Sequence, residues 1–255
     1  RAALIPVGGE GAGRQPRGCT AWAPPERDAR IAIPCGMTTR LGIDEAGRGC
    51  VLGPMVYAGC LVDLADEPAL FAAGVRDSKR LSARRRGELL GRIESTAHAT
   101  ETIAFAPELL DRVSLNELGK QAIVELVVRH APDVLVFDAP VPPLQIPGYL
   151  EDLRARLRAA GARTDLSIIG ENGADDRYAC CAAASIVAKT ARDAVLAALQ
   201  ASSRVPMGSG YPSDAVTVAY LEGACDAEGR FPPWVRTKWA TAQRIVEARG
   251  QGRLF

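Results

Sequence analysis

The stretch "TRLGIDEAGRGCVLGPMVYAGCLVD" at residues 39–63 contains two apolar runs separated by a glycine-rich segment. Residues 39–45 and 55–63 are therefore predicted to form paired strands joined by that turn. The first run ends in the adjacent acids Asp44 and Glu45, and a Gly-Arg-Gly sequence follows at once. A plain turn does not need two neighbouring carboxylates after a buried strand, so this pattern indicates a ligand site.

The chain then alternates predicted strands and helices. Residues 114–130 have apolar side chains at helical spacing, with Ser114 as N-cap and Glu117 three residues later, the capping-box pattern. Residues 133–140 are a short apolar run containing Asp138, typical of a buried central strand. Further strands are expected at 100–107 and near 164–169, and helices at 148–160, 177–200, 213–226 and 236–249. This order predicts an α/β fold with a mixed central sheet flanked by helices and a C-terminal helical extension.

The overall composition is that of an ordinary globular chain with almost no net charge. Its 255 residues are 47% hydrophobic and 24% charged, and the formal net charge is +1. A polyanionic partner must therefore be held by a local basic face rather than by the field of the whole molecule. Two groups of basic residues are candidates for such a face: Arg76, Lys79, Arg80, Arg84, Arg85 and Arg86, and then Arg230, Arg236, Lys238, Arg244, Arg249 and Arg253.

Cysteine usage points to a reducing compartment. The seven cysteines include no C-x-x-C pair, and with only two histidines the chain lacks zinc-type spacing. Cys180 and Cys181 stand in an alanine-rich run, where buried thiols are expected rather than disulfides. The most apolar long segment, 178–200, is interrupted by Lys189 and Asp193, which argues against a membrane span. We expect a cytoplasmic protein.

Acidic residues stand at the ends of two predicted strands. Asp44 and Asp138 each follow an apolar run, and the ligand sites of open α/β sheets collect at the carboxyl ends of strands. If these strands are neighbours, the carboxylates converge, which is costly unless protons or cations bridge them. The segment "ENGADDRYACC" supplies more acids. A hard cation with oxygen ligands, such as Mg²⁺, fits these surroundings, so the acids indicate phosphoryl chemistry with metal ions.

A series of short motifs connects these features. In chain order they are "GIDEAGRG", "VLGPMVYAG", "DSKRLS", "VFDA", an "AD" ten residues before the serine of "AAASIVAK", "GSGYPSD" and "FPPWVRTKW". Together they resemble the motif series of the ribonuclease HII family, the type 2 ribonucleases H, over roughly residues 40–245. "GPMVYAG" and "PPWVRTKW" are similar to the archaeal and eukaryotic branch of that family.

The resemblance implies a ribonuclease H-like fold and hydrolysis of the RNA strand of RNA–DNA hybrids. It also implies cleavage on the 5′ side of a single ribonucleotide embedded in duplex DNA. Two Mg²⁺ or Mn²⁺ ions, about 4 Å apart, would be held by four acids and would act on the attacking and leaving oxygens. The positions that match the family's four acids are Asp44, Glu45, Asp138 and Asp175.

The resemblance also assigns residues to the substrate. Gly47, Arg48 and Gly49 would grip the RNA–DNA junction, where a contact to the 2′-OH distinguishes RNA from DNA. Tyr211 matches the tyrosine that stacks beside the sugar on the 3′ side of the ribonucleotide. Basic positions hold phosphates without reading sequence. The remaining matched substrate positions are Lys79, Ser185 and Lys189.

Each of these residues also has a structural interpretation. The adjacent acids of the first strand can cap a turn, and Asp138 precedes an Ala-Pro pair, a common setting for a turn-forming aspartate. Asp175 and Asp176 can favour the N-terminus of the following helix. Asp175 is chosen because its spacing to Ser185 matches the family. Tyr211 precedes a proline and can serve loop packing.

The chain departs from the family pattern at a few positions. Cys50 stands where the family usually has proline, and Gly173 stands where it usually has lysine. Ala182 and Thr190 replace the usual Ser and Val. The glycine removes one expected phosphate or fourth-acid contact. None of these changes removes an expected metal ligand, so activity is expected.

The resemblance divides the chain as follows. Residues 1–36, rich in Gly, Pro and Arg, are expected to be a disordered or non-native extension. Residues 37–212 would form the ribonuclease H-like catalytic domain, and 213–250 a helical region. The tail 251–255, "QGRLF", resembles peptides that dock into sliding clamps of the replication machinery. Nothing demands a second subunit, so a monomer is expected.

Two other classes of function remain open. Another nuclease with a ribonuclease H-like core, such as a junction resolvase, would share the acids but should lack the Gly-Arg-Gly and Gly-Tyr-Pro sequences. A non-catalytic nucleic-acid-binding module would explain the arginines, yet clustered acids would repel its ligand. Specificity for a ribonucleotide would distinguish ribonuclease HII activity from the first alternative. Metal-dependent cleavage would distinguish it from the second.

Overall fold

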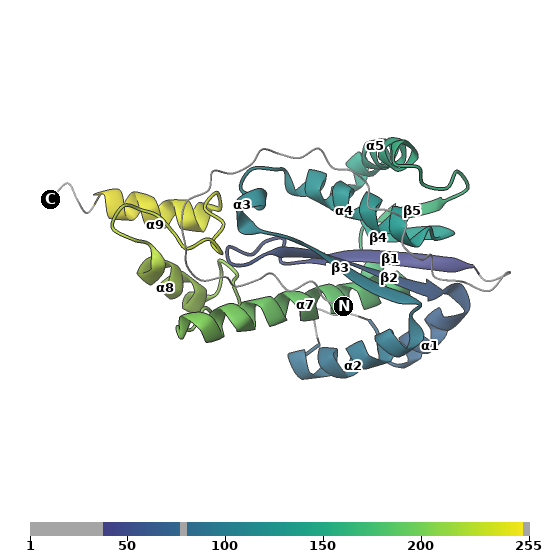
Figure 1. The fold of residues 1–255 in the computed structure, drawn as a ribbon, viewed down its shortest axis with the longest axis horizontal. Helices are drawn as coiled ribbons and strands as arrows, with labels where there is room; N and C mark the ends of the chain where they lie inside the picture. The colour runs from purple at the N-terminus through teal and green to yellow at the C-terminus, as the bar shows by residue number, and fades with distance from the viewer. Residues whose placement is uncertain (1–37, 77–80, 252–255) are drawn as a thin grey trace, which may run out of the picture.

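A five-stranded mixed sheet organises the fold in a computed structural model, which describes residues 38–76 and 81–251 (Figure 1). The strand order is β3-β2-β1-β4-β5. β1 pairs antiparallel with β2, and β2 with β3, whereas β1, β4 and β5 run parallel. The bounds are β1 Thr39–Ala46, β2 Met55–Asp63, β3 Ala99–Phe105, β4 Val134–Asp138 and β5 Ser167–Glu171. The predicted mixed sheet is thus confirmed.

Helices cover both faces of the sheet (Figure 1). α4 and α5 lie above it in this view, α1, α2 and α7 lie below it, and α8 and α9 extend the molecule at one end. The bounds are α1 Glu67–Ala72, α2 Ala83–Thr96, α3 Pro107–Leu110, α4 Leu115–His130, α5 Ile146–Ala159, α6 Ala174–Arg177, α7 Ala179–Ser203, α8 Ala215–Ala224 and α9 Ala240–Gln251. The short 3-10 helices are Leu64–Asp66 and Pro143–Gln145. The architecture is that of an α/β fold with a helical C-terminal extension.

Alternation along β1 decides which helix each side chain meets. Leu41 and Ile43 belong to the core cluster that packs against α4 and α5. Gly42 faces α7, and a Cβ added there would lie 2.1 Å from the backbone carbon of Cys180. Because no side chain separates them, the backbone of α7 rests directly on β1. This close packing brings the next residue on that face, Asp44, beside α7.

The core on the α7 side is built from small side chains. Ala58 and Cys60 of β2 pack there against the alanine-rich first turns of α7. The described cysteines are free and buried, as expected for small apolar thiols: Cys50, Cys60, Cys180, Cys181 and Cys225. Small residues at the interface allow the close approach of helix and sheet. Cys19 and Cys35 lie outside the described residues.

A third core cluster joins the C-terminal helices to the segment that follows β1. Leu52 packs there with Leu221 of α8 and Ala242 of α9. An isolated bridge pairs Leu52 with Val235, and the Gly53 N–H donates to the Trp234 carbonyl at 2.8 Å. The C-terminal region therefore braces the end of the turn between β1 and β2.

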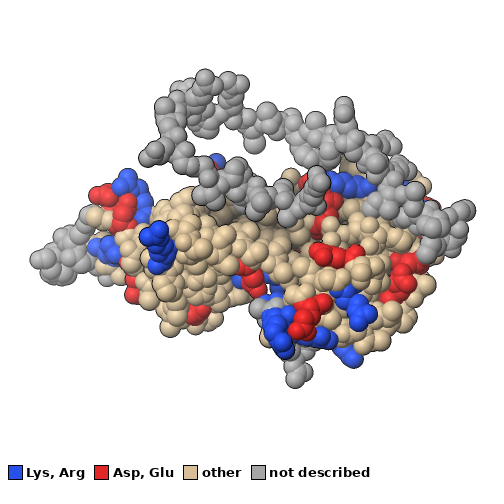
Figure 2. Space-filling model, turned by 60° about the horizontal axis from the view of Figure 1, so that its bottom comes forward, with Lys and Arg blue, Asp and Glu red and all other residues tan. Residues whose placement is uncertain are grey.

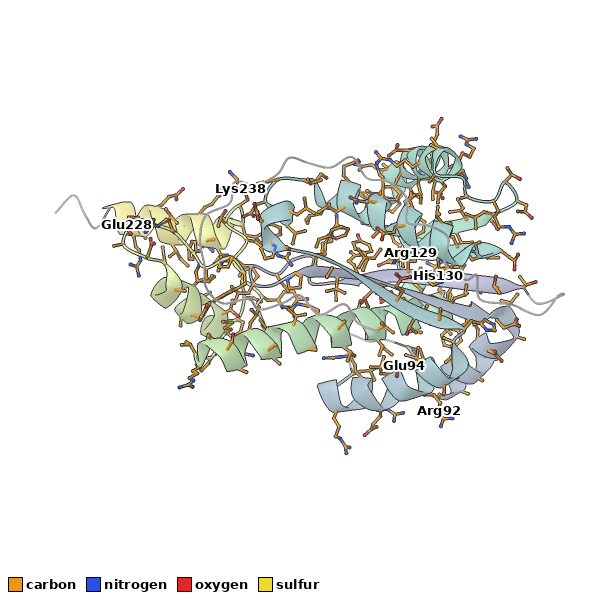
Figure 3. The ribbon with its side chains drawn as sticks, in the orientation of Figure 1. Arg92, Glu94, Arg129, His130, Glu228 and Lys238 are labelled. Carbon is orange, nitrogen blue, oxygen red and sulfur yellow. The ribbon has the colours of Figure 1, made fainter. Side chains whose placement is uncertain are left out.

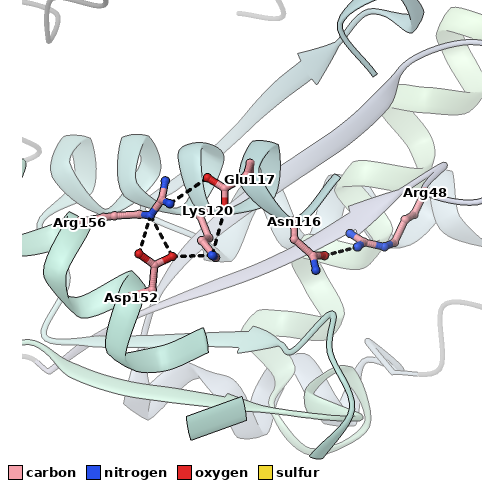
Figure 4. Close-up of polar contacts among 6 residues, drawn as sticks. All are labelled: Arg48, Asn116, Glu117, Lys120, Asp152 and Arg156. Carbon is pink, nitrogen blue, oxygen red and sulfur yellow. Dashed lines mark hydrogen bonds and ion pairs between the residues drawn. The ribbon is translucent and has the colours of Figure 1, made fainter. Parts of the chain in front are cut away.

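Several local expectations differ from the structure. β5 begins at residue 167 rather than near 164. The capping box is wrong, because the Ser114 side chain makes no capping hydrogen bond. Glu117 instead accepts from Lys120 at 3.1 Å and from Arg156 of α5 at 2.8 Å, in a charged network that ties α4 to α5 (Figure 4). The expected contact within the first turn of α4 is thus replaced by a contact between α4 and α5.

Charges of both signs are mixed over the surface seen in Figure 2, with no continuous basic field. Arg236, counted among the exposed basic residues from sequence, is fully buried in the structure. Across the residues that the structure describes, no helix combines the length and apolarity that a membrane crossing requires. The expected extension 1–36 lies outside the described residues, as do Lys79 and residues 252–255 of the tail.

Candidate active site

Asp44 lies at the C-terminal end of β1 and faces α7. Only 8% of its surface is exposed, and its carboxylate accepts from the Glu45 N–H at 2.8 Å and from the Ser185 hydroxyl. Burial raises the pKa of Asp44 to about 6 against the opposing effects of Ser185 and Lys189, and the charge of Asp175 raises it further. Asp44 is therefore a desolvated carboxylate with another acid close by.

Glu45 follows directly and shares this crowded environment. Burial raises its pKa to about 8, and the charges of Asp44 and Asp138 add to the rise. The Arg48 guanidinium opposes it, with Nη1 lying 3.8 Å from Glu45 Oε1. The structure therefore places the acids of the first strand within electrostatic reach of the acid that ends β4.

Asp138 reaches the site because β4 lies beside β1. Phe137 is the register partner of Ile43 in this parallel pair, so the next residues, Asp138 at the end of β4 and Asp44 near the end of β1, lie at the same edge of the sheet. The Gly173 N–H donates to Asp138 Oδ1 at 2.7 Å. Gly173 has φ +73°, a left-handed conformation that glycine adopts readily and lysine does not. The departure at this position thus suits the turn that orients Asp138.

Asp175 and Asp176 are neighbours in the short helix α6 but have different environments. Asp175 is 3% exposed, and its charge acts on Asp44. Asp176 is exposed to solvent. The structure therefore brings Asp175, the residue chosen from its spacing to Ser185, together with the other acids and leaves Asp176 outside.

The four acids offer only oxygen donors: Asp44, Glu45, Asp138 and Asp175. Hard divalent cations prefer such ligands, and a cation would offset the burial and the repulsion that raise the pKa values of Asp44 and Glu45. Within 38–76 and 81–251, no three His, Cys, Asp or Glu side chains already surround a point where an ion would bind. The donor chemistry fits a hard divalent cation whose shell substrate oxygens would complete.

α7 supplies the polar side of the site. Cys181, Ser185 and Lys189 follow one another at four-residue spacing, so they share one face of the helix. Cys181 Sγ donates to the Ile43 carbonyl at 3.2 Å, and Lys189 Nζ donates to Ser185 Oγ at 2.7 Å. Lys189 also lines a cavity of about 280 Å³, together with Ala46, Gly47, Arg86, Arg192, Asp193 and Tyr211. The two predicted substrate residues of α7 thus lie beside the acids.

The Gly-Arg-Gly turn is closed by a hydrogen bond from the Cys50 N–H to the Gly47 carbonyl at 3.2 Å. Proline has no N–H, so cysteine makes here a contact that the usual family residue cannot make. Gly47 has φ +81°, and a Cβ there would lie 2.9 Å from the Pro54 carbonyl oxygen. Glycine is thus required at this position by both conformation and space.

Arg48 and Tyr211 lie on two sides of this turn. The Arg48 guanidinium donates to the Asn116 side chain at the start of α4 (Figure 4). Tyr211 is 42% exposed, and a Cβ at Gly49 would lie 4.0 Å from its ring. The structure therefore brings the turn and the tyrosine together on an accessible surface.

Two contributors to the site, Arg192 and Asn116, were not singled out from sequence, and Arg236 was named only as part of a basic surface. Arg236 donates to the Arg48 carbonyl at 3.2 Å and to the Gly53 carbonyl at 3.0 Å. Arg192 contacts both the turn and the tyrosine. Asn116 orients Arg48, as described above. Sequence offers little signal for them, because buried arginines look like ordinary surface charges before the fold is known.

His130 lies at the end of α4 that is away from Arg48. His130 Nε2 lies 2.9 Å from a Glu101 carboxylate oxygen, and His130 is the last residue of α4 (Figure 3). Asn116 is at the other end of that helix, about 20 Å away at 1.5 Å per residue. His130 therefore pairs with a carboxylate of the edge strand β3.

Comparison with known proteins places this arrangement in context. The family model described as Ribonuclease HII matches residues 41–242. A Ribonuclease HII of Hyperthermus butylicus is 41% identical over 212 residues, covering 81% of this chain and 84% of that protein. The ribonuclease H2 of Pyrococcus horikoshii OT3 has a TM-score of 0.73 at 32% identity, covering 84% of this chain and 100% of that one. An RNase HII of Archaeoglobus fulgidus, solved in complex with PCNA, has a TM-score of 0.69 at 36% identity, covering 81% and 96%.

Proposed function

Because the chain belongs to the ribonuclease HII family, we propose that it is an endoribonuclease that hydrolyses the RNA strand of RNA–DNA hybrids. It also cuts on the 5′ side of a single ribonucleotide embedded in duplex DNA. The observation that carries this proposal is the meeting of acids from β1, β4 and α6, of which Asp44 and Asp175 are buried, beside the Gly-Arg-Gly turn. Such acids suit phosphodiester hydrolysis, and the turn suits recognition of a ribose.

The family depends on divalent metal ions, and the proposed ligands are Asp44, Glu45, Asp138 and Asp175. Two Mg²⁺ or Mn²⁺ ions bound there would stabilise the attacking and leaving oxygens of an in-line displacement. The protein's own contribution is to fix the positions of its carboxylates by hydrogen bonds and to offset their negative charge. Ser185 donates to Asp44, the Gly173 N–H fixes Asp138, and Lys189 lowers the cost of the buried negative charge.

The substrate lies, in this proposal, across the turn and the cavity beside it. Gly47, Arg48 and Gly49 approach the ribose closely, where the 2′-OH distinguishes RNA from DNA. Tyr211 packs against the neighbouring sugar, and its exposed position beside Gly49 supports that role. Lys189 and Lys79 hold phosphates, which position the duplex without reading its sequence.

A labelled DNA duplex with one ribonucleotide tests this function directly. In Mg²⁺ or Mn²⁺ we expect one nick immediately 5′ of the ribonucleotide, no cleavage in chelator, and no cleavage of the matched all-DNA duplex. Equal cleavage of the all-DNA duplex, or of a four-way junction, would favour another nuclease with the same core. Binding without cleavage in either metal would favour a non-catalytic module.

We propose that residues 251–255 bind a sliding clamp. The Archaeoglobus relative was solved with PCNA, and the sequence "QGRLF" begins at Gln251, the last residue of α9. Replacing Leu254 and Phe255 by Ala is expected to lower affinity for the clamp of the same organism at least about tenfold, because short docking peptides depend on a few apolar anchors. Cleavage of short duplexes should stay unchanged. Clamp affinity that is equal in the parent and the variant would refute the proposal.

We further propose that residues 37–212 form the catalytic domain, that 213–250 form its helical extension, and that the enzyme acts as a monomer in the cytoplasm. The acids and their hydrogen-bond donors come from one chain, which supports catalysis without a partner subunit. Sedimentation of the active enzyme tests the monomer.

A further inference from the structure

Arg192 is a buried arginine that the proposed chemistry does not use. It lies in α7, one turn after Lys189, and only 5% of its surface is exposed. A long cationic side chain is rarely buried to this extent unless its contacts serve a specific purpose. Its surroundings therefore indicate what it does.

The guanidinium holds the loop that carries Tyr211. Arg192 Nη2 donates to the Ser209 carbonyl at 2.7 Å, and its Cζ lies 5.4 Å from the centre of the Tyr211 ring. Asp193 Oδ1 lies 3.4 Å from Nη1 and partly balances the charge. A planar guanidinium can stack on an aromatic face and donate along its edge at the same time, which an ammonium group cannot do.

Two glycines leave room for this side chain. A Cβ at Gly47 would lie 3.1 Å from Arg192 Cδ and Nε, and a Cβ at Gly210 would lie 2.6 Å from Nη2. Both glycines have positive φ, 81° and 80°. Arg192 is thus wedged between the Gly-Arg-Gly turn and the tyrosine loop, in contact with both.

Cys50, which follows the Gly-Arg-Gly turn, also lies at the contact between that turn and the loop that carries Tyr211. The Tyr211 hydroxyl lies within hydrogen-bonding reach of the Cys50 thiol. The next two N–H groups of the turn segment, from Val51 and Leu52, both donate to the Gly210 carbonyl, at 2.8 and 3.3 Å. Arg192 therefore lies over the face of the Tyr211 ring, and the Cys50 thiol lies near the hydroxyl of that ring.

We propose that Arg192, assisted by Cys50, is a positioning residue that fixes the plane of Tyr211 against the Gly-Arg-Gly turn before substrate binds. The inference rests on the proposed function, since it concerns how the ribonucleotide is selected. A ring that is already oriented loses less freedom on binding, which favours the correct sugar. Cys50 takes part through a thiol that the usual proline lacks.

Cleavage kinetics on the single-ribonucleotide duplex test whether Arg192 acts by positioning Tyr211. Arg192→Lys keeps the positive charge but loses the planar guanidinium. We expect it to lower kcat/KM about tenfold, which corresponds to the free energy of one desolvated cation–π contact. In a Tyr211→Ala background the same change should have less than a twofold effect. Equal effects in both backgrounds would overturn the proposal. Arg204→Lys, an exposed change at the end of α7, is the matched control and should leave kcat/KM unchanged.

The orientation of the ring can be measured without any activity. With ¹³C-labelled tyrosine, the Tyr211 ring signal is identified by its absence in Tyr211→Phe. We expect the signal to shift and broaden in Arg192→Lys and, to a smaller extent, in Cys50→Ala, which removes the thiol without changing a buried charge. An unchanged signal in both variants would overturn the proposal even if the enzyme is active. If the parent cuts no ribonucleotide substrate, the proposed function fails, and the ring signal still decides this inference.

Discussion

Replacing Asp44 by Asn is expected to abolish ribonucleotide cleavage while leaving the metal-free protein at least as stable as the parent. Asn keeps the size of the side chain but removes a charge that the proposed cation site requires, so cleavage should fall at least about a thousandfold. Asp44 is buried and close to Asp175, and these surroundings raise its pKa to about 6. Its ionised form therefore costs folding free energy in the absence of metal.

The sign of the stability change follows from that pKa. The folded-state value lies above the reference value of 3.8, so the cost is absent below about pH 4 and fully present above about pH 6. Asp44→Asn should thus raise the melting temperature in chelator at pH 8 by a few degrees, on the order of 1–2 kcal/mol, and leave it unchanged at pH 4.

Asp176→Asn is the matched control for this experiment, because Asp176 is an exposed acid next to the proposed ligand Asp175. Its cleavage rate and melting temperature should both match the parent. Residual cleavage above a hundredth of the parent rate in Asp44→Asn, or a lower melting temperature at pH 8, would contradict the account of a buried cation-binding carboxylate.

Replacing Gly42 by Ala adds a single methyl group and is expected to lower the stability of the folded protein strongly. The added Cβ would lie 2.1 Å from the Cys180 backbone carbon and 2.4 Å from the Cys181 nitrogen. Backbone cannot rotate away as a side chain can, so α7 must move off β1. We expect a loss of more than about 3 kcal/mol, which is a fall of roughly 10 °C in melting temperature.

Gly91→Ala is the control, since Gly91 lies in α2 with nothing within 4 Å of an added Cβ. Alanine favours the helix there and should raise stability by about 0.5–1 kcal/mol. Thermal unfolding followed by circular dichroism measures both variants. A Gly42→Ala protein that melts within 2 °C of the parent would mean that α7 does not rest on β1 as described.

The order of strands and helices, and the proximity of Asp44 to Asp138, could be predicted from sequence for a physical reason. Hydrophobic runs of strand length ended in acids, and parallel neighbours carry their carboxyl ends to one edge. Asp44 and Asp138 followed directly from this reasoning. Asp175 did not, because an acid before a helix has an ordinary capping role, and only the family spacing separated it from Asp176.

Other features depend on contacts that are distant in sequence, and no local pattern reveals them. Ser114 has the right neighbours for a capping box, yet Glu117 bonds to Arg156 of another helix instead. Arg192 and Arg236 were indistinguishable from surface charges until the sheet and the C-terminal segment enclosed them. Burial of a polar side chain is a property of the assembled fold, so it becomes visible only in three dimensions.

The bracing of the turn by the last part of the chain has a consequence for synthesis. The turn after β1 leaves the ribosome well before Val235 and Arg236, which pair with it from much further along the chain. A nascent chain can assemble the sheet and gather its acids well before the Arg48 carbonyl acquires its partner. The acids proposed to bind metal can therefore come together before the contacts that hold the Gly-Arg-Gly turn, the proposed site of ribose recognition, are complete.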